Sequence, residues 1–303
     1  MRVLITGGTG FIGQRLTETL VAHKHYQPYL LVREAYGMGT PLPPRLMTLR
    51  EQIRLVFADL RTFSLTSRAI NEAQPDIVVH LAAQGATDPF LSVDTAVRHN
   101  LSGTLNLLRA CFEKSFTTTR LIVARTPGEI DVINSYAASK AAAWQFCRMY
   151  AQTQQWPVIG AMIFQCYGVG QSPRALLPAA LTAARAGQDF PMTAGEQTRD
   201  FIHIDDVVSG LIALIETADL PAGATAELGT GIPTSLTTAV QTIYELVDQG
   251  GQPKPGLLPA RPGEQPQPLA NLAHTQQLID WQPALTLRDG LKQLLTHSDT
   301  PNV

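Results

Sequence analysis

Short apolar runs alternate with longer stretches of helical periodicity through the first half of the chain. Runs of about four to eight apolar residues are typical of buried strands, and apolar positions at helical spacing are typical of amphipathic helices. The pattern predicts strands at 2–6, 29–32, 54–58, 76–81, 121–124 and 158–164, with helices at 11–23, 95–111 and 136–153. Because strands and helices alternate, we expect an α/β fold, a doubly wound parallel sheet with helices on both faces.

The composition of the sequence changes after Tyr167, where glycine and proline become frequent. Further helices are predicted at 175–186, at 205–217 and from about residue 287. Stretches 37–44 and 250–268 are rich in glycine and proline, so both are predicted to be loops. We expect residues 1–167, together with about 204–230, to form the main domain, and residues 168–203 and 231–297 a smaller C-terminal α/β lobe.

The bulk composition of the 303 residues is that of a globular protein, 45% hydrophobic and 16% charged. A net charge of −2 gives no support for a nucleic-acid or membrane-surface partner. No apolar run approaches the ~20 residues that span a bilayer, and Met1 leads directly into a predicted strand, so we expect no signal peptide. The three cysteines show no C-x-x-C pair. We expect a cytoplasmic protein with reduced thiols and no metal site.

A glycine-rich turn, GGTGFIG at residues 7–13, follows the first predicted strand and opens the first predicted helix. This is the context in which such a turn binds a dinucleotide diphosphate at a helix N-terminus. Gly7 permits the tight turn, Gly10 lets the backbone approach the diphosphate, and Gly13 allows close packing of helix and strand. The sequence therefore predicts a Rossmann-type dinucleotide-binding domain, although a tight turn without a ligand is the plainer alternative.

The residues at the end of the second predicted strand indicate whether the cofactor's ribose carries a 2′-hydroxyl, as in NAD, or a 2′-phosphate, as in NADP. NAD sites usually place an acid there, whereas this strand ends at Val32-Arg33-Glu34. A guanidinium at Arg33 suits a 2′-phosphate and favours NADP. In the alternative, Arg33 is a solvated charge, Glu34 binds the ribose, and the cofactor is NAD.

Tyr136 and Lys140 are one helical turn apart and are the candidate catalytic pair. Free tyrosine has a pKa near ~10, and a neighbouring lysine is expected to lower it by favouring phenolate. Tyr136 would then exchange a proton with a carbonyl or hydroxyl oxygen while hydride moves at the carbon. Thr126, just past the fifth predicted strand, is the candidate for holding that oxygen. Taken alone, this pair would be an ordinary helix-surface pair.

These residues together resemble the extended short-chain dehydrogenases/reductases of the nucleotide-sugar epimerase/dehydratase group. The resemblance runs from Met1 to about Leu295. Its motifs, in chain order, are GGTGFIG at 7–13, DL at 59–60, HLAA at 80–83, Asn100 with GT at 103–104, Tyr136 with Lys140, YG at 167–168, RDF at 199–201, DD at 205–206, GTG at 229–231, RPG at 261–263 and WQP at 281–283.

The resemblance implies roles for matching positions. Asp59 and Leu60 would flank the adenine, and Lys140 would also hold the nicotinamide ribose. The expected cofactor residues are Gly7, Gly10, Phe11, Ile12, Gly13, Arg33, Asp59, Leu60, Leu81, Ala82, Ala83, Asn100, Tyr136, Lys140 and Phe164. The expected nucleotide-sugar residues are Gln84, Gln165, Arg199 and Arg261, the two arginines because guanidinium groups suit phosphate oxygens. Alternatively, Arg199 and Arg261 serve only in surface ion pairs. A homodimer built from the Asn100 and Tyr136 helices is also expected.

The chain departs from the family pattern around the candidate site. The stretch from Thr126 to Tyr136 is shorter than usual. Pro127 and Gly128 occupy the two acid positions of sugar-nucleotide 4,6-dehydratases, and Glu129 comes one place late, which argues against a dehydratase. Gln165, Met162 and Val169 stand where Asn, Arg and Pro are usual.

The leading hypothesis is reduction of a 4-keto-6-deoxy sugar nucleotide by NADPH, with Tyr136 as proton donor. The main alternative is an NAD-dependent nucleotide-sugar 4-epimerase that uses the same residues and retains its cofactor. A third hypothesis applies the same chemistry to a carbonyl compound that is not a nucleotide sugar. A fourth is a non-catalytic NADP-binding regulator, which the presence of both Tyr136 and Lys140 disfavours.

Overall fold

The structure is a computed structural model that describes residues 1–86, 88, 90–115, 117–259 and 268–297. The chain divides into two compact units. The first comprises Met1–Met162 and Leu211–Ala226, and the second comprises Ile163–Gly210 with the described residues from Glu227 onward. None of the helices in these described stretches combines the length and apolar character needed to cross a membrane.

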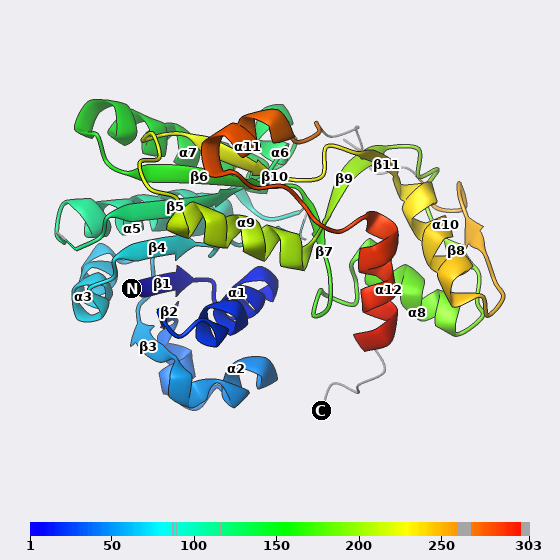
Figure 1. Ribbon diagram of the computed structural model, residues 1–303, viewed down its shortest axis with the longest axis horizontal. Helices are drawn as coiled ribbons and strands as arrows, with labels where there is room; N and C mark the ends of the chain where they lie inside the picture. The colour runs from blue at the N-terminus through cyan, green and yellow to red at the C-terminus, as the bar shows by residue number, and fades with distance from the viewer. Residues whose placement is uncertain (87, 89, 116, 260–267, 298–303) are drawn as a thin grey trace. The chain divides into compact units, whose positions relative to one another are not determined.

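A seven-stranded sheet in the order β10-β6-β5-β4-β1-β2-β3 forms the centre of the first unit (Figure 1). The strands are β1 (Arg2–Thr6), β2 (Gln27–Val32), β3 (Arg54–Phe57), β4 (Ile77–His80), β5 (Arg120–Arg125), β6 (Val158–Ile163) and β10 (Thr225–Leu228). The neighbouring pairs from β3 through β6 are parallel. The predicted α/β class with a doubly wound parallel sheet is confirmed.

Apolar strand residues and three helices form the main core of this unit. The helices are α3 (Phe63–Ala73), α5 (Gly103–Phe112) and α7 (Ser135–Gln154), while α1 (Phe11–Ala22) follows the glycine turn. Side chains such as Leu4, Val78 and Leu121 from the strands pack with Ile70 of α3 and Leu107 of α5. Burial of this apolar surface stabilises the sheet–helix layer and fixes where the strands end.

The predicted helix at 95–111 is not continuous. It consists of α4 (Val93–Ala96), a π-helical segment η3 (Val97–Ser102) and α5. Asn100 lies in the π-helical segment and is buried. Helical periodicity in the sequence does not distinguish a π turn from an α turn, and π turns are frequent at functional sites.

The predicted loop at 37–44 is bordered by short helices. A 3₁₀ turn, η1 (Glu34–Gly37), precedes it and α2 (Pro44–Thr48) follows, with a second 3₁₀ turn, η2 (Arg50–Gln52), after that. Pro44 begins α2, a position where its missing N–H costs nothing. The proline that indicated a loop therefore starts a helix.

The second unit contains two small sheets and four further helices. The sheets have the orders β11-β9-β7 and β12-β8. The elements are β7 (Gln165–Tyr167), α8 (Leu176–Arg185), β8 (Phe190–Pro191), β9 (Thr198–His203), β11 (Pro233–Ser235), α10 (Leu236–Val247), β12 (Pro253–Lys254), α11 (Leu272–Ile279) and α12 (Leu287–His297), and α9 (Ile204–Glu216) begins here. Strands of two or three residues are too short for a periodic pattern, so the sequence did not predict them. The six-residue β9 and the helices α10 and α11 were not predicted either.

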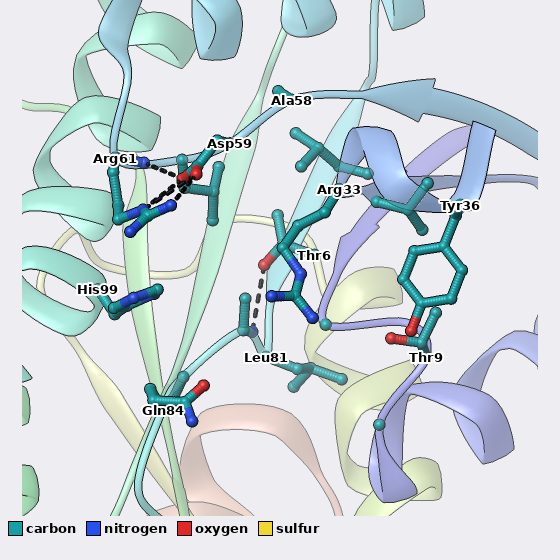
Figure 2. A pocket seen from close by; sticks show the side chains of 17 residues that line it. Thr6, Thr9, Arg33, Tyr36, Ala58, Asp59, Arg61, Leu81, Gln84 and His99 are labelled. Atoms are coloured by element: carbon teal, nitrogen blue, oxygen red, sulfur yellow. Dashed lines mark hydrogen bonds and ion pairs between the residues drawn. The ribbon is translucent and has the colours of Figure 1, made fainter. Parts of the chain in front are cut away.

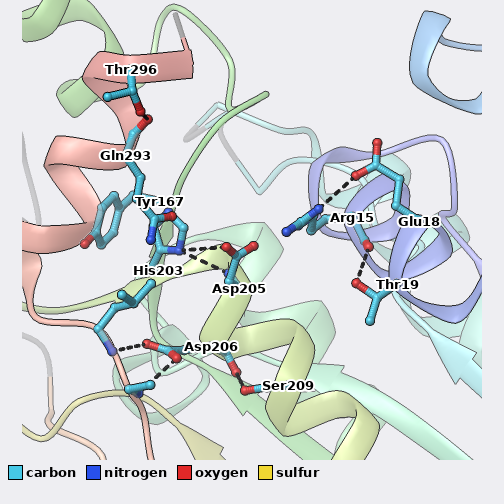
Figure 3. A network of polar contacts seen from close by, with 12 residues as sticks. Arg15, Glu18, Thr19, Tyr167, His203, Asp205, Asp206, Ser209, Gln293 and Thr296 are labelled. Carbon is cyan, nitrogen blue, oxygen red and sulfur yellow. Dashed lines mark hydrogen bonds and ion pairs between the residues drawn. The ribbon is translucent and has the colours of Figure 1, made fainter. Parts of the chain in front are cut away.

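Two buried aspartates organise this unit. The Asp200 carboxylate accepts hydrogen bonds from the backbone N–H groups of Thr230, Gly231 and Ala270 at 2.7–3.0 Å. Asp206, on α9, accepts from Ala284 and Leu285, both at 3.0 Å (Figure 3). Asp200 of the RDF motif and Asp206 of the DD motif therefore hold together loops that are distant in the sequence, including the GTG motif. These two acids have a structural role.

Candidate functional site

The glycine turn is packed so closely that side chains do not fit. Gly7 has a φ of +72°, which favours glycine, and a Cβ there would lie 2.6 Å from the backbone N of Ala82. A Cβ on Gly13 would lie 2.2 Å from the carbonyl oxygen of Gly7. The turn, the start of α1 and the segment after β4 are thus held together. Among the described residues, no side chain caps the first turn of α1, which suits a helix N-terminus that binds phosphate.

A cavity of about 260 Å³ lies at the carboxyl ends of β1, β2, β3 and β4 (Figure 2). It is lined by Thr6, Gly7, Thr9, Gly10, Leu31, Val32, Arg33, Tyr36, Ala58, Asp59, Leu60, Arg61, Leu81, Ala82, Ala83, Gln84 and His99. Open parallel sheets bind ligands in the crevice outside the carboxyl ends of their strands. A glycine turn at the ends of parallel strands is the kind of site that binds a dinucleotide diphosphate.

Many of the residues expected to bind cofactor meet in this cavity. They are Gly7, Gly10, Arg33, Asp59, Leu60, Leu81, Ala82 and Ala83, and they are joined by Gln84, which was expected to bind substrate instead. Phe11, Ile12, Gly13, Asn100, Tyr136, Lys140 and Phe164 are not among the lining residues. Sequence reasoning missed Thr9, Tyr36, Arg61 and His99. A signal existed for Arg61, which follows Asp59 in the same strand-end loop.

Asp59 and Arg61 form an ion pair inside the cavity, with Arg61 Nε 2.9 Å from Asp59 Oδ2 (Figure 2). Hydrogen bonding from Arg61 lowers the pKa of the Asp59 carboxyl. Burial lowers the pKa of His99, and the charges of Arg61 and Arg33 add to this effect while Asp59 opposes it. The cavity therefore gathers two guanidinium groups and one carboxylate, an excess of positive charge that suits an anionic ligand.

A directional chain of hydrogen bonds runs beneath the cavity. The N–H of Ala82 donates to Thr6 Oγ1 at 3.2 Å, and Thr6 Oγ1 lies 2.7 Å from His80 Nδ1. On the other side, His80 Nε2 lies 2.9 Å from Thr104 Oγ1, which donates to the Asn100 carbonyl at 2.6 Å. Because the Thr104 proton is committed to Asn100, Nε2 of His80 must donate and Nδ1 must accept.

His80 is therefore a neutral imidazole with its proton on Nε2. Complete burial lowers the pKa of His80 to about 3, and the charge of Lys140 adds to this effect. Neutrality lets one ring both donate and accept. The ring thus joins the segment after β4 to the π-helical segment that contains Asn100.

The side chain of Asn100 extends this network to α7. Its Nδ2 donates to the Gln84 carbonyl at 3.0 Å and to Ser139 Oγ at 2.9 Å, and its Oδ1 accepts from the N–H of Gln84 at 2.8 Å. Ser139 Oγ in turn donates to the Tyr136 carbonyl at 2.8 Å. Asn100 thus fixes the cavity wall relative to the start of α7. It supports the cavity through hydrogen bonds and does not line it.

The candidate catalytic pair lies at the start of α7. The Asn134 side chain caps this helix by accepting from the N–H of Ala137 at 2.8 Å. Tyr136 is half-buried and Lys140 is 5% exposed. Burial, with the charge of Glu129 acting in the same direction, raises the pKa of Tyr136 to about 12. Burial lowers the pKa of Lys140, while Glu129 acts in the opposite direction.

The expected lowering of the Tyr136 pKa is therefore not found in the protein chain by itself, where desolvation is the largest influence. Desolvation disfavours the phenolate, and the nearby charge that adds to it is a carboxylate. At neutral pH Tyr136 is a phenol, the form that donates a proton.

Glu129 belongs to α6 (Gly128–Asp131), the short helix between β5 and α7. Its side chain is 2% exposed and pairs with Arg125, whose Nε lies 2.9 Å from Glu129 Oε2. The other oxygen, Oε1, accepts from the N–H of Thr126 at 3.0 Å. Thr126, which is half-buried, is thus held through its backbone, and its side chain stays a candidate for orienting substrate.

Comparison with known proteins identifies the family. A sequence model described as the NAD dependent epimerase/dehydratase family matches residues 3–229, well over half of the chain. The chain belongs to this family. The predicted family resemblance is confirmed.

Relatives of this epimerase/dehydratase family member differ in the reactions their names state. An uncharacterized UDP-glucose epimerase of Bacillus subtilis is 26% identical over 96% of both chains. A GDP-6-deoxy-D-mannose reductase of Pseudomonas aeruginosa is 26% identical over 97% of this chain and 96% of its own. The structure of UDP-glucuronic acid 4-epimerase from Bacillus cereus, with UDP-glucuronic acid and NAD, superposes with a TM-score of 0.82 at 22% identity, covering 97% of each chain. This last comparison shows the fold.

As a member of the epimerase/dehydratase family, the chain is an enzyme that depends on a nicotinamide dinucleotide. Within the described stretches, no group of three or more His, Cys, Asp or Glu side chains is placed to hold a metal ion. Cys111 and Cys147 are buried free thiols, and Cys166 is a half-buried one.

The remaining candidate residues belong to the second unit of this family member. Phe164 is 6% exposed, and Gln165 is exposed at the start of β7. Arg199 lies on β9, where its Nη1 donates to the Thr198 carbonyl at 2.8 Å. Arg261 lies outside the described residues. Phe164, Gln165 and Arg199 keep their expected roles as proposals.

Proposed function

We propose that the protein is an NADPH-dependent reductase of a 4-keto-6-deoxy sugar nucleotide. One observation carries the proposal: Arg33, at the end of the second strand, lines the cavity together with Arg61. A guanidinium at the end of the second strand suits a 2′-phosphate, and NADPH suits net reduction. The reductase among the relatives, named for GDP-6-deoxy-D-mannose, is consistent with this choice.

The chain's own residues supply the proton and the orientation for this reaction. A bound nicotinamide supplies the hydride. The Tyr136 hydroxyl donates its proton to the substrate's carbonyl oxygen, the group on which negative charge develops. Lys140, one turn further along α7, stabilises the phenolate left behind. The Thr126 hydroxyl donates a hydrogen bond that orients the same oxygen.

The substrate would be recognised by residues of the second unit. We propose that Arg199 and Arg261 bind the diphosphate of the sugar nucleotide and that Gln165 donates or accepts through its amide. Guanidinium groups match phosphate oxygens in geometry and charge. The proposed division of labour is thus cofactor chemistry in the first unit and substrate recognition in the second.

A nucleotide-sugar 4-epimerase is the second candidate, because epimerases are prominent among the relatives and the same residues would serve. An epimerase begins by removing a proton from a hydroxyl group, which requires phenolate at Tyr136. The raised pKa of Tyr136 disfavours the phenolate that an epimerase needs and also makes the phenol a weaker acid for a reductase, so it favours neither candidate.

We also propose a homodimer in which α7 contributes to the interface. Phe146 and Met149 on this helix are 42% and 39% exposed, an apolar pair of the kind found at interfaces. Trp144, on the same helix, is buried in the core of its own unit.

The cofactor decides between the two candidate functions. The purified protein would be denatured and any released dinucleotide identified, and NADPH and NADH would then be titrated separately. An exchangeable site that prefers NADPH, followed by NADPH oxidation on addition of a 4-keto-6-deoxy sugar nucleotide, is the result that we expect. Tightly retained NAD, with interconversion of two sugar nucleotides, would replace the reductase with the epimerase.

A further inference from the structure

The Asp59 carboxylate is fully occupied by its contacts with Arg61. Its Oδ1 accepts from the backbone N–H of Arg61 at 2.9 Å and from Nε at 3.0 Å. Its Oδ2 accepts from Nε at 2.9 Å and also from Nη2 (Figure 2). An ionised carboxylate has about four acceptor positions. Each oxygen already has two donors, so Asp59 has no acceptor position left for a ligand.

The backbone of the same loop is committed as well. The Asp59 carbonyl accepts from the N–H of Thr62 at 2.9 Å, which closes a turn ahead of α3. The Leu60 carbonyl accepts from Asn106 Nδ2 on α5 at 2.8 Å. These contacts hold the loop after β3 in place. The polar side-chain group that this loop presents to the cavity is the guanidinium of Arg61, whose side chain is 45% exposed.

The cavity orders the parts of a dinucleotide along its length. Thr9 belongs to the glycine turn, where the diphosphate is expected, and Arg33 stands where the ribose is expected. In Figure 2 Thr9 lies on one side of Arg33, and the ion pair of Asp59 and Arg61 lies on the other. A nucleotide runs from phosphate through ribose to base, so the base belongs at the end with the ion pair.

The side chains at this end differ in what they can offer to a base. Adenine has an amino group at C6, which donates, whereas hypoxanthine has a carbonyl there, as guanine does, which accepts. Arg61 has only donors, while a neutral His99 and the amide of Gln84 each offer both a donor and an acceptor. Among the described residues that line the cavity, only Asp59 has a side chain restricted to accepting, and Arg61 occupies it.

Building on the dinucleotide site of the proposed function, we propose that Arg61 sets the base specificity of this site. By occupying Asp59 and presenting donors in its place, Arg61 lets the site bind a hypoxanthine dinucleotide nearly as well as the adenine dinucleotide. A carboxylate left free to accept from the amino group of adenine would reject hypoxanthine, because two acceptors would then face each other.

The test compares two reduced dinucleotides that differ at C6 of the base, NADPH and its hypoxanthine analogue. Both carry the same nicotinamide, whose fluorescence can follow the binding of each, and the ratio of the two dissociation constants is the quantity compared. We expect the wild-type constants to differ by less than about 3-fold. Arg61→Leu should raise the preference for adenine to about 10-fold or more, because a charged acceptor becomes available.

The Arg61→Leu variant keeps Asp59 in place, because the backbone N–H of residue 61 still donates to Oδ1. Loss of the positive charge should weaken the binding of both dinucleotides alike, and this effect cancels in the ratio. The double variant Arg61→Leu/Asp59→Asn should lose the new preference for adenine, because an amide both donates and accepts.

A matched control is available in the same unit. Arg109 on α5 pairs with Glu113 at 3.0 Å, another contact between arginine and carboxylate, and neither residue lines the cavity. Arg109→Leu breaks this pair and should leave the ratio of the two dissociation constants unchanged.

Two results would overturn the role of Arg61. One is a wild-type protein that prefers NADPH to the hypoxanthine analogue by about 10-fold or more, a comparison that needs no variant. The other is a ratio in Arg61→Leu equal to that of the wild type. Repeating the measurements with NADH and its hypoxanthine analogue keeps the test independent of the 2′-phosphate. Because only binding is measured, failure to reduce a 4-keto sugar nucleotide would reject the proposed reaction and leave the base specificity standing.

Discussion

Lowering the pH should destabilise the protein through His80. The buried ring has a pKa of about 3 in the folded protein, against ~6.5 for histidine in an unfolded chain. The unfolded state therefore binds more protons than the folded state between these values, so stability is full above ~6.5 and is lost as pH falls toward 3. Linkage gives a loss of about 2 kcal/mol in the free energy of unfolding between pH 7 and pH 5.

His80→Gln isolates this contribution. A glutamine amide can also accept from Thr6 and donate to Thr104, but it does not titrate. Urea unfolding at pH 7 and pH 5 would be followed by tryptophan fluorescence, with Trp144 and Trp156 reporting on the first unit. Other titrating groups are common to both proteins and cancel in the comparison.

We expect the wild type to lose about 2 kcal/mol more than His80→Gln over this pH interval. Equal losses in the two proteins would mean that His80 is not kept neutral by burial. Nitrogen NMR of the ring supplies an independent check, because the hydrogen-bond chain requires the proton on Nε2. A proton found on Nδ1 would reverse the direction assigned to the chain.

Three further variants address the proposed chemistry and assembly. Tyr136→Phe should reduce turnover by about 100-fold or more with dinucleotide binding retained, since general acid catalysis contributes roughly that factor; near-normal turnover would exclude Tyr136 as the donor. Arg33→Asp should weaken NADPH binding by about 10-fold or more and leave NADH binding less affected, because a charge-assisted bond is lost; an unaltered preference in a titration would remove Arg33 from the 2′-phosphate site. Phe146→Glu should convert the dimer to monomer in light scattering, whereas an unchanged mass would place any interface elsewhere.

Six of the seven strands of the central sheet were predictable because their information is local, whereas β10 was not predicted. Val3, Leu4 and Ile5 form a wholly buried strand, and the glycine turn that follows permits one backbone path. The strand and the turn can each be recognised from residues that are adjacent in the sequence. The cavity was predictable for the same reason, since its glycines and strand-end residues occur in motifs of fixed spacing.

What the sequence did not reveal depends on contacts between distant segments. His99 reaches the cavity from the π-helical segment η3, far from the glycine turn in the sequence. The ion pair between Asp59 and Arg61 is a local contact, but the residue types alone did not reveal it. The π-helical segment around Asn100 has the same apolar spacing as an α-helix. Glu129 was set aside for its position in a motif, although it is buried, pairs with Arg125 and accepts from the N–H of Thr126.

The space left at Gly160 has a consequence for mutational scans and redesign of this enzyme. Gly160 has no side chain and lies on a buried strand, where alanine or valine would be the usual choice in a redesign. A side chain there would meet Thr225, Arg125 and Trp144, and would push the guanidinium away from Glu129. A saturation library should therefore rank Gly160 among the least tolerant strand positions.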